Sequence, residues 1–279
     1  VYNISSVLDD FLYSSIMTSL GSKTKQIVME WGIFGEYHVL FNIPVALANA
    51  LSSSLIPALT MAVASHDRKK TLSQIRVSIR FTLLIAVPCS IGMAVLADPL
   101  SRMLFPGKNV HLLIQLTRVG SFAVLLYSLS TITNAILQGL GHLNLPLYHS
   151  MVALVLHLLS LVLFLYAGLG IYGVVLSNIV FALIMCFLNQ RAIFRHTRFR
   201  IDFFRSLVMP MLSGLIMGGA AYVIYFVIHV VLPGGLRKGR VGSALSLLPA
   251  VFIAILIYFF LLLKSHTLTR EDLDEMPMG

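Results

Sequence analysis

Two adjacent carboxylates, Asp9 and Asp10, stand in an otherwise apolar stretch near the start of the chain. Carboxylates inside a membrane helix are costly unless they are paired, protonated or in contact with water. In a water-filled cavity they could bind cations, relay protons or accept hydrogen bonds from a sugar. Because adjacent helix positions point in different directions, at most one of them can face a given cavity. The alternative is a place near the helix entrance, among lipid headgroups.

The same pair could belong to an enzyme of polyprenyl-phosphate metabolism, which would use acidic motifs to hold magnesium and pyrophosphate. Such a motif needs carboxylates one helical turn apart, so that both reach one metal. Tyr13 and Ser14 occupy those positions, so the pattern argues against a metal site and against an enzyme. The sequence also has no glycine-rich phosphate loop, and we expect no cofactor.

Three further polar residues open the second apolar run. Glu36, Tyr37 and Asn42 could line the outer mouth of a cavity, while Glu36 could instead anchor the helix at the membrane interface. Since either role needs a position near the boundary of the bilayer, the sequence leaves both open.

Asn134 and Gln138 lie four residues apart and therefore on one face of a helix. They could contact substrate hydroxyls or bond to a neighbouring helix. His157 lies within a long apolar run, with no charged residue near it in sequence. A histidine in this setting is more often bonded to another helix than used as a ligand.

The elements that must position these residues are membrane helices. Hydrophobic residues make up 58% of the 279 residues and charged residues 11%, whereas soluble domains have about 45–50% and about 25%. Residues 119–190 contain no Asp, Glu, Lys or Arg, and a crossing takes about 20 residues. Because backbone groups in hydrocarbon must be satisfied within a segment, we expect an all-α integral membrane protein.

Apolar runs and their breakers predict eight helical segments. Cys89 and Cys186 lie inside such runs and are expected to be small packing residues rather than metal ligands. The predicted segments are residues 2–20, 33–64, 74–104, 113–139, 145–168, 171–195, 204–232 and 242–264.

The net charge of +9 does not indicate a nucleic-acid partner, because the basic residues gather between apolar runs and no recognition motif accompanies them. Such clusters are typical of the cytoplasmic loops of membrane proteins. They place both ends of the chain in the cytoplasm, including the acidic tail. The two largest clusters are Arg68, Lys69, Lys70, Arg76 and Arg80, and Arg191, Arg195, Arg198, Arg200 and Arg205.

Several stretches resemble the stage V sporulation protein B-like polysaccharide-transport family. Residues 35–48 and 55–59 are similar to the family's eighth helix, and residues 136–142 with Pro146 are similar to its segment between helices ten and eleven. The glycine-rich run 168–173 before an apolar helix also fits. Their order and spacing agree across nearly the whole chain.

This resemblance implies one half of a fourteen-helix transporter of the multidrug, oligosaccharidyl-lipid and polysaccharide flippase superfamily. Residues 1–200 would be the second six-helix lobe, 201–264 an additional helix pair and 265–279 a cytoplasmic tail. The first lobe would be missing, which agrees with a chain that opens with Val1 rather than Met.

Relatives in this family move lipid-linked cell-wall precursors, notably lipid II, across the bacterial plasma membrane. The expected partners are therefore a polyprenyl-linked glycan, membrane lipid and the missing lobe. Known lipid II flippases line their cavity with arginines. Here no arginine is expected deep within a helix, since Arg102 and Arg118 lie near helix ends, and the phosphate-binding residues are expected in the absent lobe. A cation-coupled drug exporter of the same superfamily, with Asp9 or Asp10 as its ion site, is the alternative.

Overall fold

The computed structural model describes residues 2–107, 109–200, 204–232 and 239–264, and all its regular elements are helical. The expected all-α membrane fold is confirmed. The elements are α1 (Tyr2–Ser19), α2 (Thr24–Ala64), α3 (Arg68–Val95), α4 (Ala97–Leu104), α5 (Val110–Gly139), α6 (Asn144–Tyr166), α7 (Ile171–Thr197), the π-helical turn η1 (Phe204–Val208), α8 (Met209–Val231) and α10 (Gly239–Lys264).

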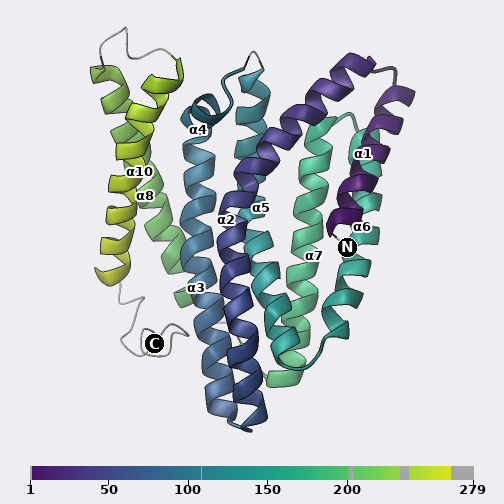
Figure 1. Cartoon of the computed structure of the whole chain (residues 1–279), viewed down its shortest axis with the longest axis vertical. Helices are drawn as coiled ribbons and strands as arrows, with labels where there is room; N and C mark the ends of the chain where they lie inside the picture. The colour runs from purple at the N-terminus through teal and green to yellow at the C-terminus, as the bar shows by residue number, and fades with distance from the viewer. Residues whose placement is uncertain (1, 108, 201–203, 233–238, 265–279) are drawn as a thin grey trace.

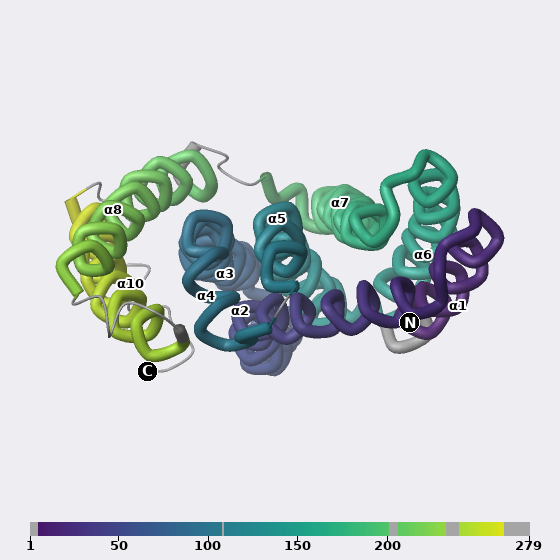
Figure 2. The backbone as a smooth tube through the Cα atoms, turned by 90° about the horizontal axis from the view of Figure 1, so that it is seen from above, coloured from purple at the N-terminus to yellow at the C-terminus, as the bar shows by residue number. Residues whose placement is uncertain are grey.

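Seen from above, the helices form a curved row (Figure 2). The α8–α10 pair stands at one end, α3, α5 and the lower part of α2 lie in the middle, and α7, α6 and α1 complete the other end (Figures 1 and 2). Helix α5 packs against α2, α3 and α7 and is the centre of the bundle. The α8–α10 pair joins the rest mainly through α3 and α4.

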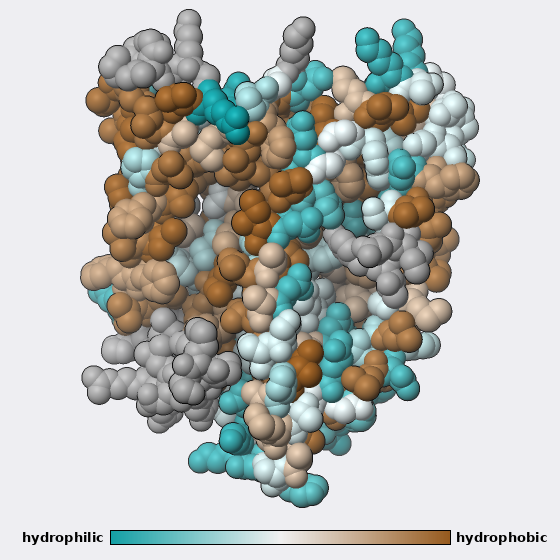
Figure 3. All heavy atoms as spheres, in the orientation of Figure 1, coloured by the Kyte–Doolittle hydropathy of each residue, from teal (hydrophilic) through white to brown (hydrophobic). Residues whose placement is uncertain are grey.

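Seven of the described helices are long and apolar enough to cross a membrane. They comprise α2, α3, α5, α6, α7, the segment Ser206–Val231 and the segment Arg240–Lys264. Helix α1 corresponds to the first of the eight expected segments. It has 18 residues, includes Asp9 and Asp10, and does not meet this criterion. Large apolar side chains cover the outer face of the α8–α10 pair, seen as brown atoms in Figure 3.

Helix α2 is the longest element, and its predicted start at residue 33 is wrong. It begins at Thr24 and has 41 residues, which at 1.5 Å per residue is about 60 Å, twice the hydrocarbon thickness of about 30 Å. Pro44 and Pro57 lie inside it, and each removes one backbone hydrogen bond. The helix runs obliquely from the α1 side to the middle of the bundle (Figure 1).

The predicted single helix over 74–104 is also wrong, because it is divided into α3 and α4. Pro99 explains the division. A proline ring clashes with the carbonyl four residues earlier, which is that of Val95, the last residue of α3. Leu96, with φ −99° and ψ 19°, joins the two helices, and its amide still bonds to the carbonyl of Gly92 at 2.9 Å.

The early start of α3 corrects one further expectation. Since α3 begins at Arg68 rather than at residue 74, Arg80 lies about three turns inside the helix. Its side chain is buried, at 5% exposure. An arginine therefore does lie deep within a helix of this chain.

Close helix packing depends on glycine at defined positions. A Cβ atom at Gly120 of α5 would lie 2.2 Å from the Tyr37 hydroxyl oxygen of α2. On α8, Gly214 and Gly218 face Ile91 of α3, and Cβ atoms there would lie 2.7 and 2.8 Å from its side chain. This small-xxx-small spacing lets two membrane helices approach closely.

Candidate functional site

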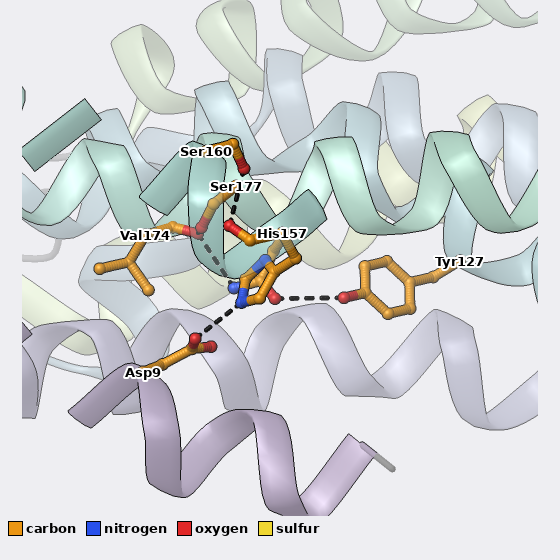
Figure 4. Close-up of polar contacts among 7 residues, drawn as sticks. Asp9, Tyr127, His157, Ser160, Val174 and Ser177 are labelled. Carbon is orange, nitrogen blue, oxygen red and sulfur yellow. Dashed lines mark hydrogen bonds and ion pairs between the residues drawn. The ribbon is translucent and has the colours of Figure 1, made fainter. Parts of the chain in front are cut away.

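A buried acid–base pair joins α1 to α6. Nε2 of His157 lies 2.7 Å from Oδ1 of Asp9, and Figure 4 shows the two side chains pointing toward each other. His157 is fully buried and Asp9 is 4% exposed. Asp10 is exposed and accepts a 3.5 Å hydrogen bond from Ser14. Burial of a charged group without a partner is expensive, and this contact gives the Asp9 carboxylate and Nε2 of His157 a partner in each other.

Helix α7 completes the surroundings of the imidazole ring. The backbone of Ser177 contacts the ring, and the Phe181 ring lies edge-on to it with centroids 6.0 Å apart. One turn of α7 thereby fixes the ring from the side opposite Asp9 (Figure 4). The sequence offered no signal for this pairing, because Asp9 and His157 are 148 residues apart.

A cavity of about 200 Å³ lies beside the pair. Asp9 forms part of its wall, and Asp10 does not. Most of the lining groups are polar or aromatic, so the cavity offers hydrogen-bonding partners between the helices. The lining consists of Ser5, Ser6, Asp9, Trp31, Phe34, Gly35, His38 and Asn178.

Aromatic rings connect this cavity to the centre of the bundle. Trp31 stacks on Tyr13 with centroids 5.5 Å apart and lies 5.1 Å from Phe34. The Tyr13 hydroxyl donates to Glu30. On α5, the Tyr127 hydroxyl donates to Oδ1 of Asn178 at 3.2 Å. Rigid rings with satisfied hydroxyls give the cavity a fixed wall.

The three residues expected at an outer mouth do not gather around one cavity. Tyr37 is buried, and its hydroxyl donates to the carbonyl of Gly120 at 3.3 Å. Asn42 is exposed and bonds to His38 at 2.9 Å. Glu36 lines a separate hollow of about 320 Å³ near residues 105–110. Tyr37 points into the α2–α5 contact because Gly120 leaves room for its ring.

Asn134 belongs to a second buried polar cluster, which links α5, α6 and α7. Nδ2 of Asn189 donates to Oδ1 of Asn134 at 2.8 Å and to Thr133 at 3.1 Å. Oδ1 of Asn189 lies 2.8 Å from Nδ1 of His149. Of the two expected alternatives, the structure therefore gives Asn134 a partner on a neighbouring helix. Gln138 is half-buried one turn further along α5.

An apolar groove separates the α8–α10 pair from α2 and α3. It has a volume of about 440 Å³. Gly92 and Pro88 of α3 lie on one wall, and Ala254 and Tyr258 of α10 lie on the other. The Tyr258 hydroxyl donates to the carbonyl of Leu84 at 2.9 Å, which leaves an almost purely apolar surface. Such a groove suits hydrocarbon rather than a polar ligand.

No metal centre appears among the residues that the structure describes, since no three His, Cys, Asp or Glu side chains gather there. Cys89 and Cys186 are partly buried free thiols on different helices. The described geometry is therefore that of a helical bundle with a small polar cavity and a larger apolar groove.

The sequence model described as "Lipid II flippase MurJ" matches residues 33–236, which is more than half of the chain. The chain belongs to the MurJ lipid II flippase family. It is 24% identical over 275 residues to the uncharacterized membrane protein YabM of Bacillus subtilis, covering 98% of this chain and 50% of that protein. It is 25% identical to the probable lipid II flippase MurJ of Bdellovibrio bacteriovorus, covering 79% and 42%.

The fold also agrees with solved transporters. A lipid II flippase MurJ in its inward closed conformation matches with a TM-score of 0.65 at 15% identity, covering 92% of this chain and 50% of that one. An outward-facing MATE multidrug transporter of the MOP superfamily matches with a TM-score of 0.57 at 18% identity, covering 95% and 67%. The chain spans about half the length of the curated relatives that it matches. It is a multi-pass membrane protein of the MurJ family.

Proposed function

We propose that this chain supplies one half of a transporter that moves lipid II across the bacterial plasma membrane by alternating access. The observation that carries the proposal is the match of the MurJ family model to residues 33–236. The matched range includes α3, α5, α6, α7 and α8, which make up most of the described bundle. The curved row of helices supports the proposal, because a lobe of a rocking transporter needs a face to oppose its counterpart.

In this proposal residues 1–200 are the second six-helix lobe and residues 201–264 are the additional pair. The separation of α8 and α10 from the other helices in Figure 2 supports that division. The partner lobe would be the first half of the same protein, as the half-length coverage of the relatives suggests. Residues 265–279, the acidic tail, lie outside the described residues, and their cytoplasmic position rests on the distribution of Lys and Arg.

The substrate poses two physical problems that the two cavities suit. A charged pyrophosphate–sugar head must be kept from hydrocarbon, and a polyprenyl tail must stay in it. The polar cavity at Asp9 provides hydrogen-bonding groups on one part of the lobe. The apolar groove between α3 and α10 provides a path for the tail. We propose that each takes its matching end of the substrate.

The Asp9–His157 pair would then hold α1 against α6 while the cavity changes its access. Asn42 is proposed as an exposed polar position along the substrate's path, and Glu36 and Gln138 as half-buried ones. Asp10 is exposed and lies outside the cavity lining, so we assign it no role in transport. Tyr37 and Asn134 are proposed as positioning residues, since both bond to neighbouring helices.

We further propose that the protein acts as a transporter and not as an enzyme. Membership in a flippase family supports this. Drug export is the less favoured function, because the family model that matches is that of a lipid II flippase, whereas the MATE structures, at 18–19% identity, share the fold alone.

The test is depletion, in its own host, of the gene product that contains this chain. Lipid II accessible to a reagent added outside the cells should fall, while the internal pool rises. Restoring the wild-type gene should reverse both changes. Unchanged external lipid II during depletion would contradict the proposal, and loss of cationic-dye resistance instead would favour the exporter.

A further inference from the structure

Another cavity lies at the opposite end of the bundle from α4, where α2, α5 and α7 end and α3 begins. Its volume is about 450 Å³. We call it the basic pocket, defined by His66, Arg68, Thr71, His196 and Arg198 in its lining. Among the described residues that line it, none is acidic. Figure 3 shows hydrophilic residues gathered at this lower end of the molecule.

A third imidazole adjoins the basic pocket. The ring of His142, in the turn between α5 and α6, lies against that of His196 with centroids 3.9 Å apart. Burial lowers the pKa of His142, and the neighbouring His196 lowers it further. Two imidazoles in contact repel each other once both are charged. An anion placed between the basic groups would remove that repulsion.

Two residues that line the basic pocket have an unfavourable backbone conformation. Among the described residues, the two non-glycine positions with positive φ are His66 (φ 55°) and Arg198 (φ 60°). Each costs about 1–2 kcal/mol relative to a right-handed conformation. Arg198 is the C-cap of α7 and His66 follows the C-cap of α2, where glycine is the usual choice for a positive φ. Both line the basic pocket. Such outliers cluster at ligand sites.

Helix stability does not explain the charge on α3. Arg68 begins that helix, and the positive end of a helix dipole disfavours cations. Asp67 is already engaged, since its side chain accepts from the Lys70 amide at 2.9 Å. On α7, the Arg198 guanidinium lies 5.9 Å from the centroid of the Phe194 ring. This contact positions a planar donor group without neutralising its charge.

We propose that the basic pocket binds a phosphate-bearing anion. Guanidinium groups bind phosphate oxygens through paired N–H donors, and Arg68 and Arg198 supply two such groups from different helices. His66, His142 and His196 become additional donors when they are protonated. The same chemistry fits an anionic lipid headgroup and inorganic phosphate. The site is independent of the proposed transport function.

The proposal predicts that binding strengthens as the pH falls. Protonated imidazoles attract an anion and neutral ones do not, so affinity should rise through the range in which His142 gains its proton. The groups that face the site are His66 from the α2–α3 turn, Arg68 from α3, His142 from the α5–α6 turn, His196 from α7 and Arg198 directly after α7. Asp67 is the acidic neighbour, and its side chain accepts a hydrogen bond from the Lys70 amide.

The experiment uses the chain in nanodiscs made from phosphatidylcholine alone or with phosphatidylglycerol. Inorganic phosphate is titrated into the first by calorimetry. Lipids retained from the second are counted by native mass spectrometry before and after phosphate is added. Phosphate binding that also displaces phosphatidylglycerol assigns the site to both sources. Retained phosphatidylglycerol without phosphate binding assigns it to a lipid headgroup. Phosphate binding without retained lipid assigns it to the free anion.

The double variant Arg68→Gln/Arg198→Gln should weaken binding at least tenfold, and His142→Gln should reduce its dependence on pH between 7.5 and 5.5. The matched control is Arg118→Gln, an exposed arginine near the start of α5. Circular dichroism checks that each variant stays folded, and Arg68→Lys/Arg198→Lys keeps the charge if the glutamine variant does not fold. No binding of either probe by the wild-type chain, or equal binding by a folded charge-removing variant, would overturn the proposal.

Discussion

Asp9 and His157 form a 2.7 Å contact in the interior of the bundle, with both side chains almost completely buried. The contact joins a helix at the start of the chain to one in its second half. Helix α1 is not among the helices long and apolar enough to cross a membrane, so this polar contact and those of Tyr13 with Glu30 and Trp31 help to fix its place. The pair therefore helps to hold α1 against α6.

Removing one member of the pair should destabilise the protein strongly. Asp9→Ala leaves a buried imidazole without its partner, and the loss of one member of a buried ion pair costs about 3–5 kcal/mol. Asp9→Asn keeps a hydrogen-bonding group and should cost less, yet it should impair transport because the charge is gone. Thermal unfolding in detergent and the external lipid II assay measure the two effects.

Asp10→Asn is the matched control, because Asp10 is adjacent in sequence and exposed. Its stability and transport should remain near those of the wild type. The interpretation fails if the Asp10 variant is affected as much as the Asp9 variant, or if Asp9→Asn transports normally.

The sequence predicted the membrane class and the helices well because these depend on local hydrophobicity. It could not predict the Asp9–His157 contact, since a pairing across 148 residues depends on how α1 and α6 pack. For the same reason Tyr37 was expected in a cavity and instead fills the space above Gly120. Long-range packing decides where a polar side chain points.

Helix boundaries failed where one residue outweighed the apolar pattern. Pro99 ends α3 at Val95 although the apolar run continues. Conversely, α3 extends back through a basic segment to Arg68, which buries Arg80. Charged residues at a helix start were interpreted as loop, although an Asp67 cap on the Lys70 amide stabilises the first turn.

Gly120→Ala tests the contact between α2 and α5. The added methyl group would lie 2.2 Å from the Tyr37 hydroxyl oxygen, so the ring or the helix must move. We expect a loss of about 1–3 kcal/mol in stability, as overpacked cores show. Thermal unfolding measures it, and the same Gly120→Ala change should cost less in a Tyr37→Ala background, because the clashing ring is then absent. Gly219→Ala, which meets nothing within 4 Å, is the control and should not destabilise.

Asn189→Ala should break the polar cluster that links α5, α6 and α7. Its amide bonds to Asn134, Thr133 and His149, and the variant removes these three contacts, although Thr133 keeps its hydrogen bonds to the carbonyls of Leu129 and Ser130. A loss of about 1–3 kcal/mol is expected for each buried group left unsatisfied. Asn42→Ala, at an exposed position, should change the unfolding temperature little. Equal effects of the two substitutions would show that the cluster does not stabilise the bundle.

Gly92→Phe tests whether the apolar groove takes the polyprenyl tail. Gly92 lines the groove, and a Cβ atom there meets nothing within 4 Å, so a phenyl ring would occupy the groove without displacing a helix. Transport of lipid II should fall about tenfold or more, which corresponds to about 1.4 kcal/mol, while the unfolding temperature stays near that of the wild type. Gly219→Phe adds the same ring at an open position of α8 away from the groove lining and should transport normally. Normal transport by the Gly92 variant would mean that the tail follows another path, because a blocked groove cannot hold it.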